Sequence, residues 1–200
     1  MKLIVFGASG SCGGHFVRFA RANGHEVTTV VRADGDVLDA AFVARAVRGH
    51  DAIVSALGMR YAHPWARRES PDDFTTRALA NIVRAAKLAG LSRVVAISAA
   101  GVGDSRPAMN WPMKVMLKTS NVGVAYADLE NMEALFRESG LDWQAVRPTT
   151  LTHKPRTDRA HVTSAFGVTA TIPREDVAAF MLHELESSSF TARTPMITVT

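Results

Sequence analysis

The sequence predicts an α/β fold, in which a doubly wound, mainly parallel sheet carries helices on both faces in three αβα layers. Three observations lead to this prediction. Short apolar segments rich in β-branched residues alternate with longer segments of helical periodicity, which is the pattern of βαβ units. The first apolar segments are almost wholly hydrophobic, as expected for parallel strands covered on both faces. A glycine-rich turn joins the first strand to the first helix.

The first half of the chain is expected to contain three strands and three helices in alternation. The third helix has the clearest start signal, because Ser70 can act as its N-cap, Pro71 suits the first turn, and two acids follow at the positive end of the helix dipole. The expected strands cover residues 2–6, 26–31 and 51–58, and the expected helices are a segment from the glycine turn to Asn23-Gly24, a short segment capped by Asp39, and a segment from Ser70 to Gly90.

The second half continues the alternation, with two exceptions. Strands are expected at residues 93–98, 143–146 (ending at Arg147-Pro148) and 196–199, and helices are expected to end at Ser139-Gly140 and to run from Pro173 to about Glu186. The segments at about 101–122 and 149–171 fit no element. Because both follow the C-terminal ends of strands, where this architecture places its ligands, we interpret them as substrate-side loops of a single domain spanning residues 1–200.

The composition is that of an ordinary globular protein, with 47% hydrophobic and 21% charged residues. The net charge of +4 comes from Lys and Arg scattered along the chain, which favours a phosphate-bearing small ligand over nucleic acid. A single cysteine excludes an internal disulfide, and the histidines show no metal-ligand spacing. No stretch approaches the roughly 20 apolar residues of a membrane span, so we expect a cytoplasmic protein without a metal or a membrane partner.

The glycine turn Gly7-Ala8-Ser9-Gly10-Ser11-Cys12-Gly13 is typical of a Rossmann-type dinucleotide-binding fold. A pyrophosphate can approach the backbone there, because the helix start offers free N–H groups and a partial positive charge. The alternative is a tight turn without a ligand; a P-loop is excluded, since Gly14-His15 stands where Lys-Ser/Thr would be needed. The residues expected to bind the coenzyme here are Gly7, Ser9, Gly10, Ser11, Cys12 and Gly13.

Arg32 indicates which coenzyme binds. Proteins that bind NAD generally place an acid at the end of the second strand to hold the ribose 2′-hydroxyl. Here that strand ends in Val30-Val31-Arg32, and a guanidinium there can pair with a 2′-phosphate. The sequence therefore favours NADP(H) over NAD(H), with a solvated surface cation as the alternative interpretation of Arg32.

Taken together, the motifs resemble one family. The chain is similar to the atypical short-chain dehydrogenase/reductases of the NmrA-like and biliverdin-reductase-B (flavin reductase)-like group. The matching features extend over most of the chain and are the glycine turn, Val31-Arg32, Gly35-Asp36-Val37-Leu38-Asp39, Val54-Ser55-Ala56-Leu57-Gly58, Arg93 to Ser98, Ser139 to Trp143, Val146-Arg147-Pro148, and Arg174 to Ala178.

The resemblance implies positions for the rest of the coenzyme. Asp36 and Val37 are expected to border the adenine, and Ala56, Leu57 and Gly58 to line the ribose. Ser98 is expected near the nicotinamide, with Pro148 and Thr149 closing the other side. The segment from Arg174 to Val177 is expected to be structural, tying the last helix to the sheet.

The chain departs from the wider superfamily at the catalytic pair. Those dehydrogenases use a Tyr-x-x-x-Lys pair, in which the lysine lowers the pKa of the tyrosine. The nearest candidate here is Tyr126, where Glu130 replaces the lysine, and a negative charge nearby would raise the pKa of the tyrosine. Tyr126 and Ser98 are the candidate catalytic residues; for Tyr126, a buried aromatic or a ring that stacks on substrate are the alternatives.

Without the lysine, the reaction should need little proton transfer from the protein. Flavins, quinones and similar planar acceptors meet this condition, so we expect an NADPH-dependent reductase of such an acceptor. The alternative is a non-catalytic, NADP-sensing regulator of the NmrA type that binds another protein. A sugar-nucleotide epimerase or dehydratase is disfavoured, because only about fifty residues follow Pro148 and the Tyr/Lys pair is incomplete.

Three further features allow more than one interpretation. Cys12 could be a redox-sensitive thiol whose pKa the helix start depresses, or a small residue in a crowded loop. The segment Arg60–Arg68 could flank the nicotinamide pocket, contact an acidic substrate, or be a solvated loop. The segment Trp111–Leu117 could be a lid over a planar substrate, or a short helix packed on the core or on a partner.

Overall fold

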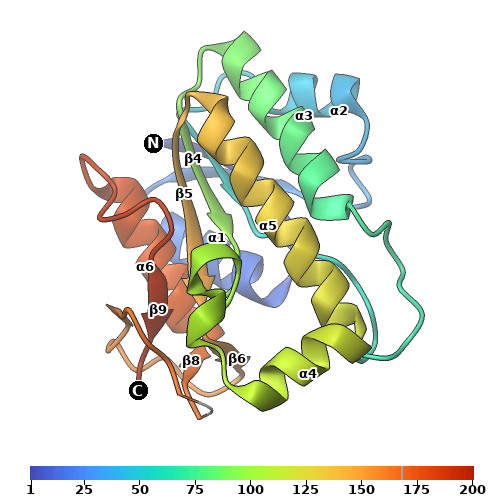
Figure 1. The fold of residues 1–200 in the computed structure, drawn as a ribbon. Helices are drawn as coiled ribbons and strands as arrows, with labels where there is room; N and C mark the ends of the chain where they lie inside the picture. Colours follow the sequence, from blue (N-terminus) through green and yellow to red (C-terminus); the bar gives the residue numbers. More distant parts are fainter. Residues whose placement is uncertain (168) are drawn as a thin grey trace.

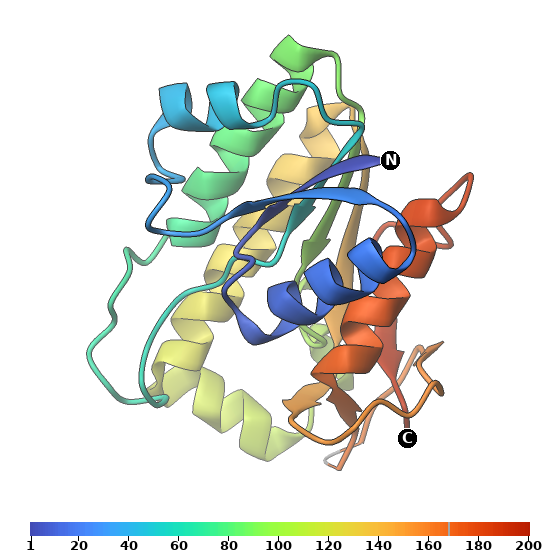
Figure 2. The ribbon, with the colours of Figure 1, turned by 180° about the vertical axis from the view of Figure 1, so that it is seen from behind.

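A computed structural model describes residues 1–167 and 169–200 of the chain. It confirms the α/β fold: a seven-stranded sheet in the order β2-β1-β3-β4-β5-β9-β7 lies between two layers of helices (Figures 1 and 2). The strands of this sheet are β1 Lys2–Phe6, β2 Glu26–Val30, β3 Ala52–Ser55, β4 Arg93–Ile97, β5 Asp142–Pro148, β7 His161–Val162 and β9 Met196–Thr198. The helices on its faces are α1 Ser11–Ala22, α2 Ala40–Ala46, α3 Phe74–Ala89, α5 Asn121–Ser139 and α6 Arg174–Glu186.

The sheet is parallel except at one edge, where β7 pairs antiparallel with β9. Phe6 at the end of β1 is in register with Val30 of β2 on one side and with Ser55 of β3 on the other. Strand β2 lies on one side of β1 and strand β3 on the other, so the direction in which successive strands are added reverses at β1. This reversal opens a crevice at the C-terminal ends of these strands, the general ligand position of such folds.

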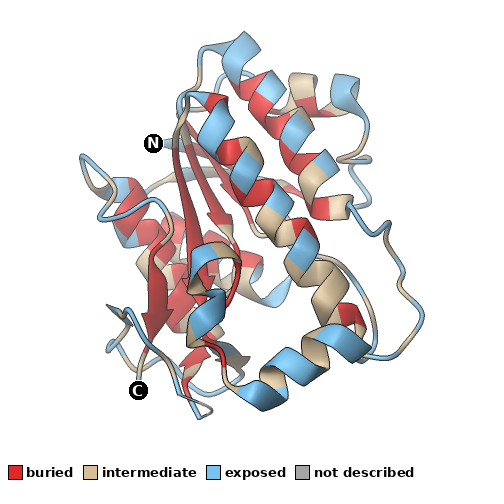
Figure 3. Ribbon diagram, in the orientation of Figure 1, coloured by how far each residue is buried: buried red, intermediate tan, exposed pale blue. Residues whose placement is uncertain are grey.

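The strands are covered on both faces because their side chains alternate between two cores. Leu3 and Val5 of β1 belong to the core under α1 and α6, whereas Ile4 and Phe6 belong to the core under α2, α3 and α5. All four of these side chains are fully buried, and the central strands are buried between the layers, whereas the edge strands β2 and β7 are partly or fully exposed (Figure 3). Burial on both faces explains why the strands read as continuous apolar segments.

The start of α3 differs from the prediction. The helix begins four residues after Ser70, with Asp73 at the N-cap position and without a side-chain hydrogen bond from it. Instead, the buried carboxylate of Asp128 in α5 accepts from the backbone amides of Thr75 and Thr76, at 2.7 and 2.9 Å. The prediction of Ser70 as the cap was wrong because a residue distant in sequence satisfies the free amides of the helix.

The segment 101–122 is not a loop, so the prediction of a substrate-side loop there was wrong. It contains a 3₁₀ helix, Gly103–Ala108, and helix α4, Trp111–Thr119, followed directly by the start of α5. The side chain of Asn110 caps α4 by accepting from the amide of Met113 at 3.0 Å. No residue of α4 is fully buried, but Met113, Met116 and Leu117 recur at helical spacing and are partly covered.

The segment 149–171 carries short strands. Strand β6, Thr150–Thr152, pairs in parallel with β8, Thr171–Pro173, in a separate two-stranded sheet, and β7 lies between them in sequence. Residue 168, which falls inside this predicted loop, lies outside the described residues. Within the described residues, no helix has the length and hydrophobicity needed to cross a membrane.

Candidate functional site

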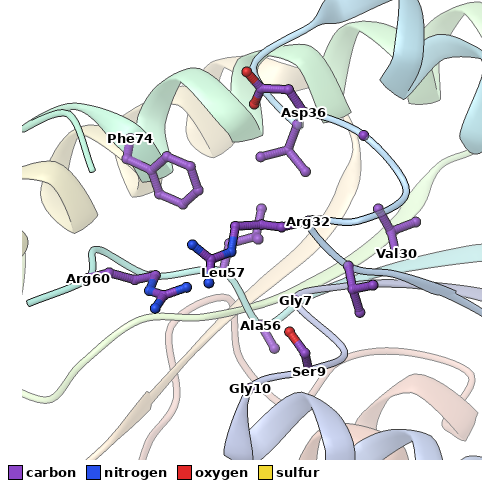
Figure 4. A pocket seen from close by; sticks show the side chains of 14 residues that line it. Gly7, Ser9, Gly10, Val30, Arg32, Asp36, Ala56, Leu57, Arg60 and Phe74 are labelled. Atoms are coloured by element: carbon purple, nitrogen blue, oxygen red, sulfur yellow. The ribbon is translucent and has the colours of Figure 1, made fainter. Parts of the chain in front are cut away.

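A cavity of about 900 Å³ lies where the strand order reverses. It is formed by the glycine turn after β1, the residues that follow β2 and β3, and the first residue of α3 (Figure 4). The residues that line this coenzyme crevice are Gly7, Ser9, Gly10, Val30, Val31, Arg32, Gly35, Asp36, Val37, Ala56, Leu57, Gly58, Arg60 and Phe74.

Two positions of the glycine turn require glycine for different reasons. Gly7 has a φ of +79°, and a Cβ atom there would lie 2.7 Å from the backbone oxygen of Ala56. At Gly13, a Cβ would collide with the backbone oxygen of Gly7. The two glycines allow the turn to pass close to β3 and the first turn of α1 to pack on the turn itself.

The start of α1 is suited to an anion. The helix begins at Ser11 with Gly10 as the N-cap, no side chain caps its amides, and its first turn contains no acidic residue. Its free N–H groups and the positive end of its dipole therefore face the crevice beside Ser9, as a pyrophosphate requires. The residues present fit a dinucleotide, because the glycines leave open the space that a phosphate backbone must enter.

Two arginines lie at the far end of the crevice from the turn. Arg32 follows β2 and Arg60 follows β3, and their guanidinium groups point toward one another across the cavity (Figure 4). Arg60 is held by an ion pair from its Nη2 to Oε2 of Glu69 at 3.1 Å. The carboxylate of Asp36 accepts from the amide of Leu38 at 2.9 Å, so it is engaged in its own turn. The two arginines are therefore accompanied by two carboxylates, that of Glu69 on Arg60 and that of Asp36 in the crevice lining.

The crevice brings together most of the residues that the sequence assigned to the coenzyme, namely Gly7, Ser9, Gly10, Arg32, Asp36, Val37, Ala56, Leu57 and Gly58. The remaining assigned residues lie outside its lining, along the start of α1 or at the ends of β4 and β5, and they are Ser11, Cys12, Gly13, Ser98, Pro148 and Thr149. Arg60 and Phe74 line the crevice although the sequence did not assign them to it. Arg60 lies five residues after the end of β3, whereas Arg32 lies two residues after the end of β2, so no shared spacing indicated Arg60.

Cys12 lies in the first turn of α1 and is partly buried. Burial raises the pKa of its thiol to about 11, against a smaller lowering by the charge of Arg174. Of the two interpretations of Cys12, the one in which the helix start depresses the pKa of the thiol is therefore contradicted, and a small residue in a crowded loop remains. Desolvation outweighs the helix dipole here, and Cys12 is a protonated thiol at neutral pH.

Ser98 is buried and belongs to a charged network. Its hydroxyl donates to Oε1 of Glu133 at 2.7 Å, and the same carboxylate accepts from Nε and Nη2 of Arg147 at 2.8 and 2.5 Å. The side chains of Glu133 and Arg147 are 0% and 2% exposed, and Arg147 also donates to Asp104 at 2.6 Å. This network joins β5, α5 and the 3₁₀ helix, and no sequence motif predicts it.

Tyr126 lies on α5 with its hydroxyl donating to the backbone oxygen of Ala100 at 3.1 Å. Burial raises the pKa of this phenol to about 12, and Tyr61 adds to the shift. Glu130, at the position where a lysine would be needed, pairs instead with Arg106 at 2.6 Å. Tyr126 is therefore protonated at neutral pH, and nothing around it lowers its pKa.

Thr149 is buried at the end of β5, where its hydroxyl donates to the hydroxyl of Thr198 at 3.3 Å. Pro148 is the last residue of β5 and is also buried.

Within residues 1–167 and 169–200, no group of three or more His, Cys, Asp or Glu side chains is arranged to hold a metal ion.

Comparison with known proteins identifies the family. A family model described as NAD(P)H-binding matches residues 33–188. The chain belongs to this NAD(P)H-binding family. The glycine turn predicted a nicotinamide dinucleotide, and the family binds NAD(P)H. The expected relationship to NAD(P)-dependent reductases agrees with this match.

Several solved structures share the fold over nearly their whole length. One is the anaerobilin reductase ChuY of Escherichia coli O157:H7, with a TM-score of 0.78 and 23% identity over 98% of this chain and 96% of that one. Another, from Streptococcus pneumoniae TIGR4 and provisionally named an NADH-flavin reductase, has a TM-score of 0.75 and 20% identity over 99% of both chains. At these identities, the likeness establishes the shared fold.

Proposed function

We propose that the protein is an NADPH-dependent reductase that transfers hydride to a flavin, a quinone or a similar planar acceptor. The observation that carries this proposal is the pairing of Arg32 with Arg60 at the end of a crevice that begins at the glycine turn. A dinucleotide whose pyrophosphate lies at the start of α1 extends its adenosine toward these two cations.

The two arginines favour NADPH over NADH. A guanidinium forms paired, charge-assisted hydrogen bonds with a phosphate, and two guanidinium groups can hold one 2′-phosphate from both sides. The 2′-hydroxyl of NADH is uncharged, so the two guanidinium groups bind it more weakly than a 2′-phosphate. Phe74 lines the same end of the crevice and offers a ring against which the adenine can pack.

The nature of the acceptor is argued from the state of the two candidate proton donors, Ser98 and Tyr126. NADPH supplies hydride when bound. The hydroxyl of Ser98 is committed to Glu133, and that of Tyr126 is committed to a backbone oxygen, with a pKa raised to about 12. An acceptor that delocalises the incoming electron pair and takes its proton from solvent suits this site, whereas a simple ketone needs a proton donor at the reacting oxygen.

Support also comes from the neighbours in fold, two of which carry the names anaerobilin reductase and NADH-flavin reductase. The test is to follow NADPH oxidation in the presence of FMN, a naphthoquinone and a simple ketone. We expect turnover with at least one of the planar acceptors and none with the ketone. Turnover of the ketone alone would contradict the proposal.

A second candidate function is an NADP-sensing regulator that binds another protein. It is favoured by α4, which exposes Trp111 at 74% and Val115 at 48% on a helix without a buried residue. The acceptor panel separates the two functions, because a regulator binds NADPH tightly but oxidises it with none of the acceptors.

A further inference from the structure

A second cavity, of about 300 Å³, lies between the first half of α1, the residues that follow β6, and the start of α6. We call it the α1–α6 pocket. It shares no lining residue with the coenzyme crevice, and neither the family match nor the expected coenzyme positions account for it. Its lining residues are His15, Thr152, His153, Lys154, Pro155, Arg174 and Glu175.

Two polar atoms at this pocket are buried without a partner. Nη1 of Arg174 and Oγ1 of Thr152 are inaccessible to solvent and form no hydrogen bond within residues 1–167 and 169–200. A buried guanidinium nitrogen without an acceptor is costly, because the water it has lost is not replaced. Because neither atom is accessible to solvent, a ligand oxygen in the pocket can reach it only after the side chain turns toward the pocket.

The charges around the pocket are predominantly positive. Arg174 and Lys154 carry fixed charges, and His15 and His153 add two imidazoles. The one acid, Glu175, is already engaged: its Oε1 pairs with Arg18 and lies 3.4 Å from Nδ1 of His15, and its Oε2 accepts from the amide of Arg156 at 3.1 Å. A ligand entering the pocket therefore meets free cations and a carboxylate that is already compensated.

We propose that the α1–α6 pocket binds an oxyanion, a phosphate or a carboxylate, in addition to the phosphates of the coenzyme. The guanidinium of Arg174 and the ammonium of Lys154 supply charge-assisted donors. The pocket lies beside the start of α1, since His15 of its lining belongs to that helix and follows Cys12 by three residues. This position suits the acidic arm of the acceptor, an assignment that rests on the proposed function.

The first test measures anion binding itself on protein saturated with NADP⁺, so that the coenzyme crevice is filled. Inorganic phosphate and acetate are titrated separately at constant ionic strength, and the thermal midpoint is recorded. We expect Arg174→Gln to weaken the binding of at least one anion by about tenfold or more, the usual effect of removing a charge-assisted hydrogen bond. The anion that shows the effect distinguishes a phosphate from a carboxylate ligand.

The matched control is Arg84→Gln, which removes the same charge from an exposed position of α3. Lys154→Gln, also at an exposed position, provides a second variant if Arg174→Gln does not fold. It should also weaken the binding of the anion. Equal responses of the wild type, Arg174→Gln and Lys154→Gln would overturn the proposal. So would a loss of NADP⁺ affinity in Arg174→Gln with an unchanged anion response, because Arg174 would then serve the coenzyme.

The second test compares FMN with riboflavin, which share the ring and differ in the phosphate. If the oxyanion is the acidic arm of the acceptor, the wild type has a lower KM for FMN, and Arg174→Gln removes this preference without changing kcat for riboflavin. Equal KM values for the two flavins in the wild type would overturn the acceptor assignment. Failure of every acceptor, with the anion effect of Arg174→Gln intact, would reject the reductase and retain the oxyanion site.

Discussion

Arg32 and Arg60 are two single residues on which the preference for NADPH should depend. Replacing either by Ala is expected to weaken the binding of NADPH by about tenfold. This effect lies in the lower part of the range for charged hydrogen bonds, because both side chains are partly exposed to solvent. NADH should bind almost unchanged. Fluorescence titration of both coenzymes measures the effect, with Arg84→Ala as the control for lost charge.

An equal loss of NADPH and NADH affinity in Arg32→Ala would show that this guanidinium does not contact the 2′-phosphate. A loss confined to Arg32→Ala, with Arg60→Ala unchanged, would leave Arg60 as the partner of Glu69 alone.

Cys12 should be slow to alkylate at neutral pH. Burial raises the pKa of its thiol from 9.0 to about 11, so at pH 8 it holds about a hundredfold less thiolate than an unperturbed thiol. The rate with iodoacetamide should rise with pH up to about 11, because the thiolate, and not the thiol, reacts. The same reaction in denaturant gives the reference rate, and rapid alkylation of the native protein at pH 7 would contradict the expected protonation.

At the scale of elements, the packing of α1 on the glycine turn can be tested at two adjacent glycines. A Cβ at position 13 would collide with the backbone oxygen of Gly7, whereas one at position 14 would lie 3.5 Å from that of Ala8, an ordinary contact. Gly13→Ala should cost about 1–3 kcal/mol of stability, as overpacking does, and weaken NADPH and NADH alike. Gly14→Ala is the control, and it should be neutral or slightly stabilising, because Ala favours the helix.

The network of Glu133 should tie α5 to β5 through a buried ion pair. Glu133→Ala leaves the guanidinium of Arg147, 2% exposed, without its main partner, and should lower the free energy of unfolding by about 3–5 kcal/mol. Glu130→Ala on the same helix breaks only an exposed pair with Arg106 and should cost at most about 1 kcal/mol. Urea denaturation measures both, and equal effects would argue against a structural role for the network.

Elements could be predicted from the sequence wherever one local pattern determines them. The strands β1 to β5 and β9 and the helices α1, α2, α5 and α6 were recognisable because each has apolar residues at the spacing of its element, whereas β6, β7 and β8 were not predicted. The start of α3 was not, because its cap is Asp128, a residue of another helix. A short helix was one of the two interpretations of the segment Trp111–Leu117, and α4 confirms that a helix forms there.

At the scale of the whole molecule, the coenzyme should stabilise the chain as one unit. We predict a single thermal transition whose midpoint temperature NADP⁺ raises. At a concentration one hundred times its dissociation constant, NADP⁺ should add about 2.7 kcal/mol to the free energy of unfolding. NAD⁺ at the same concentration should raise it less. Calorimetry tests this, and a second transition that does not respond to NADP⁺ would contradict a single domain spanning residues 1–200.

The position of the site could be predicted because it is a property of the topology. Alternating strands and helices determine where the strand order reverses, and that point determines the crevice. The side chains that face it are less predictable. Arg60 reaches the crevice only because the chain after β3 runs back across it, and the network of Ser98 with Glu133 depends on how α5 packs on β5.

The two opposed guanidinium groups also bear on how readily the protein could be redesigned for another coenzyme. Each is carried by a different crossover of the sheet, so exchanging Arg32 alone for an acid would place a carboxylate opposite the remaining arginine and create an internal pair across the opening. That pair would compete with the ribose of NADH. Conversion to NADH should therefore require both positions to change together, and either exchange alone should yield a protein that binds both coenzymes poorly.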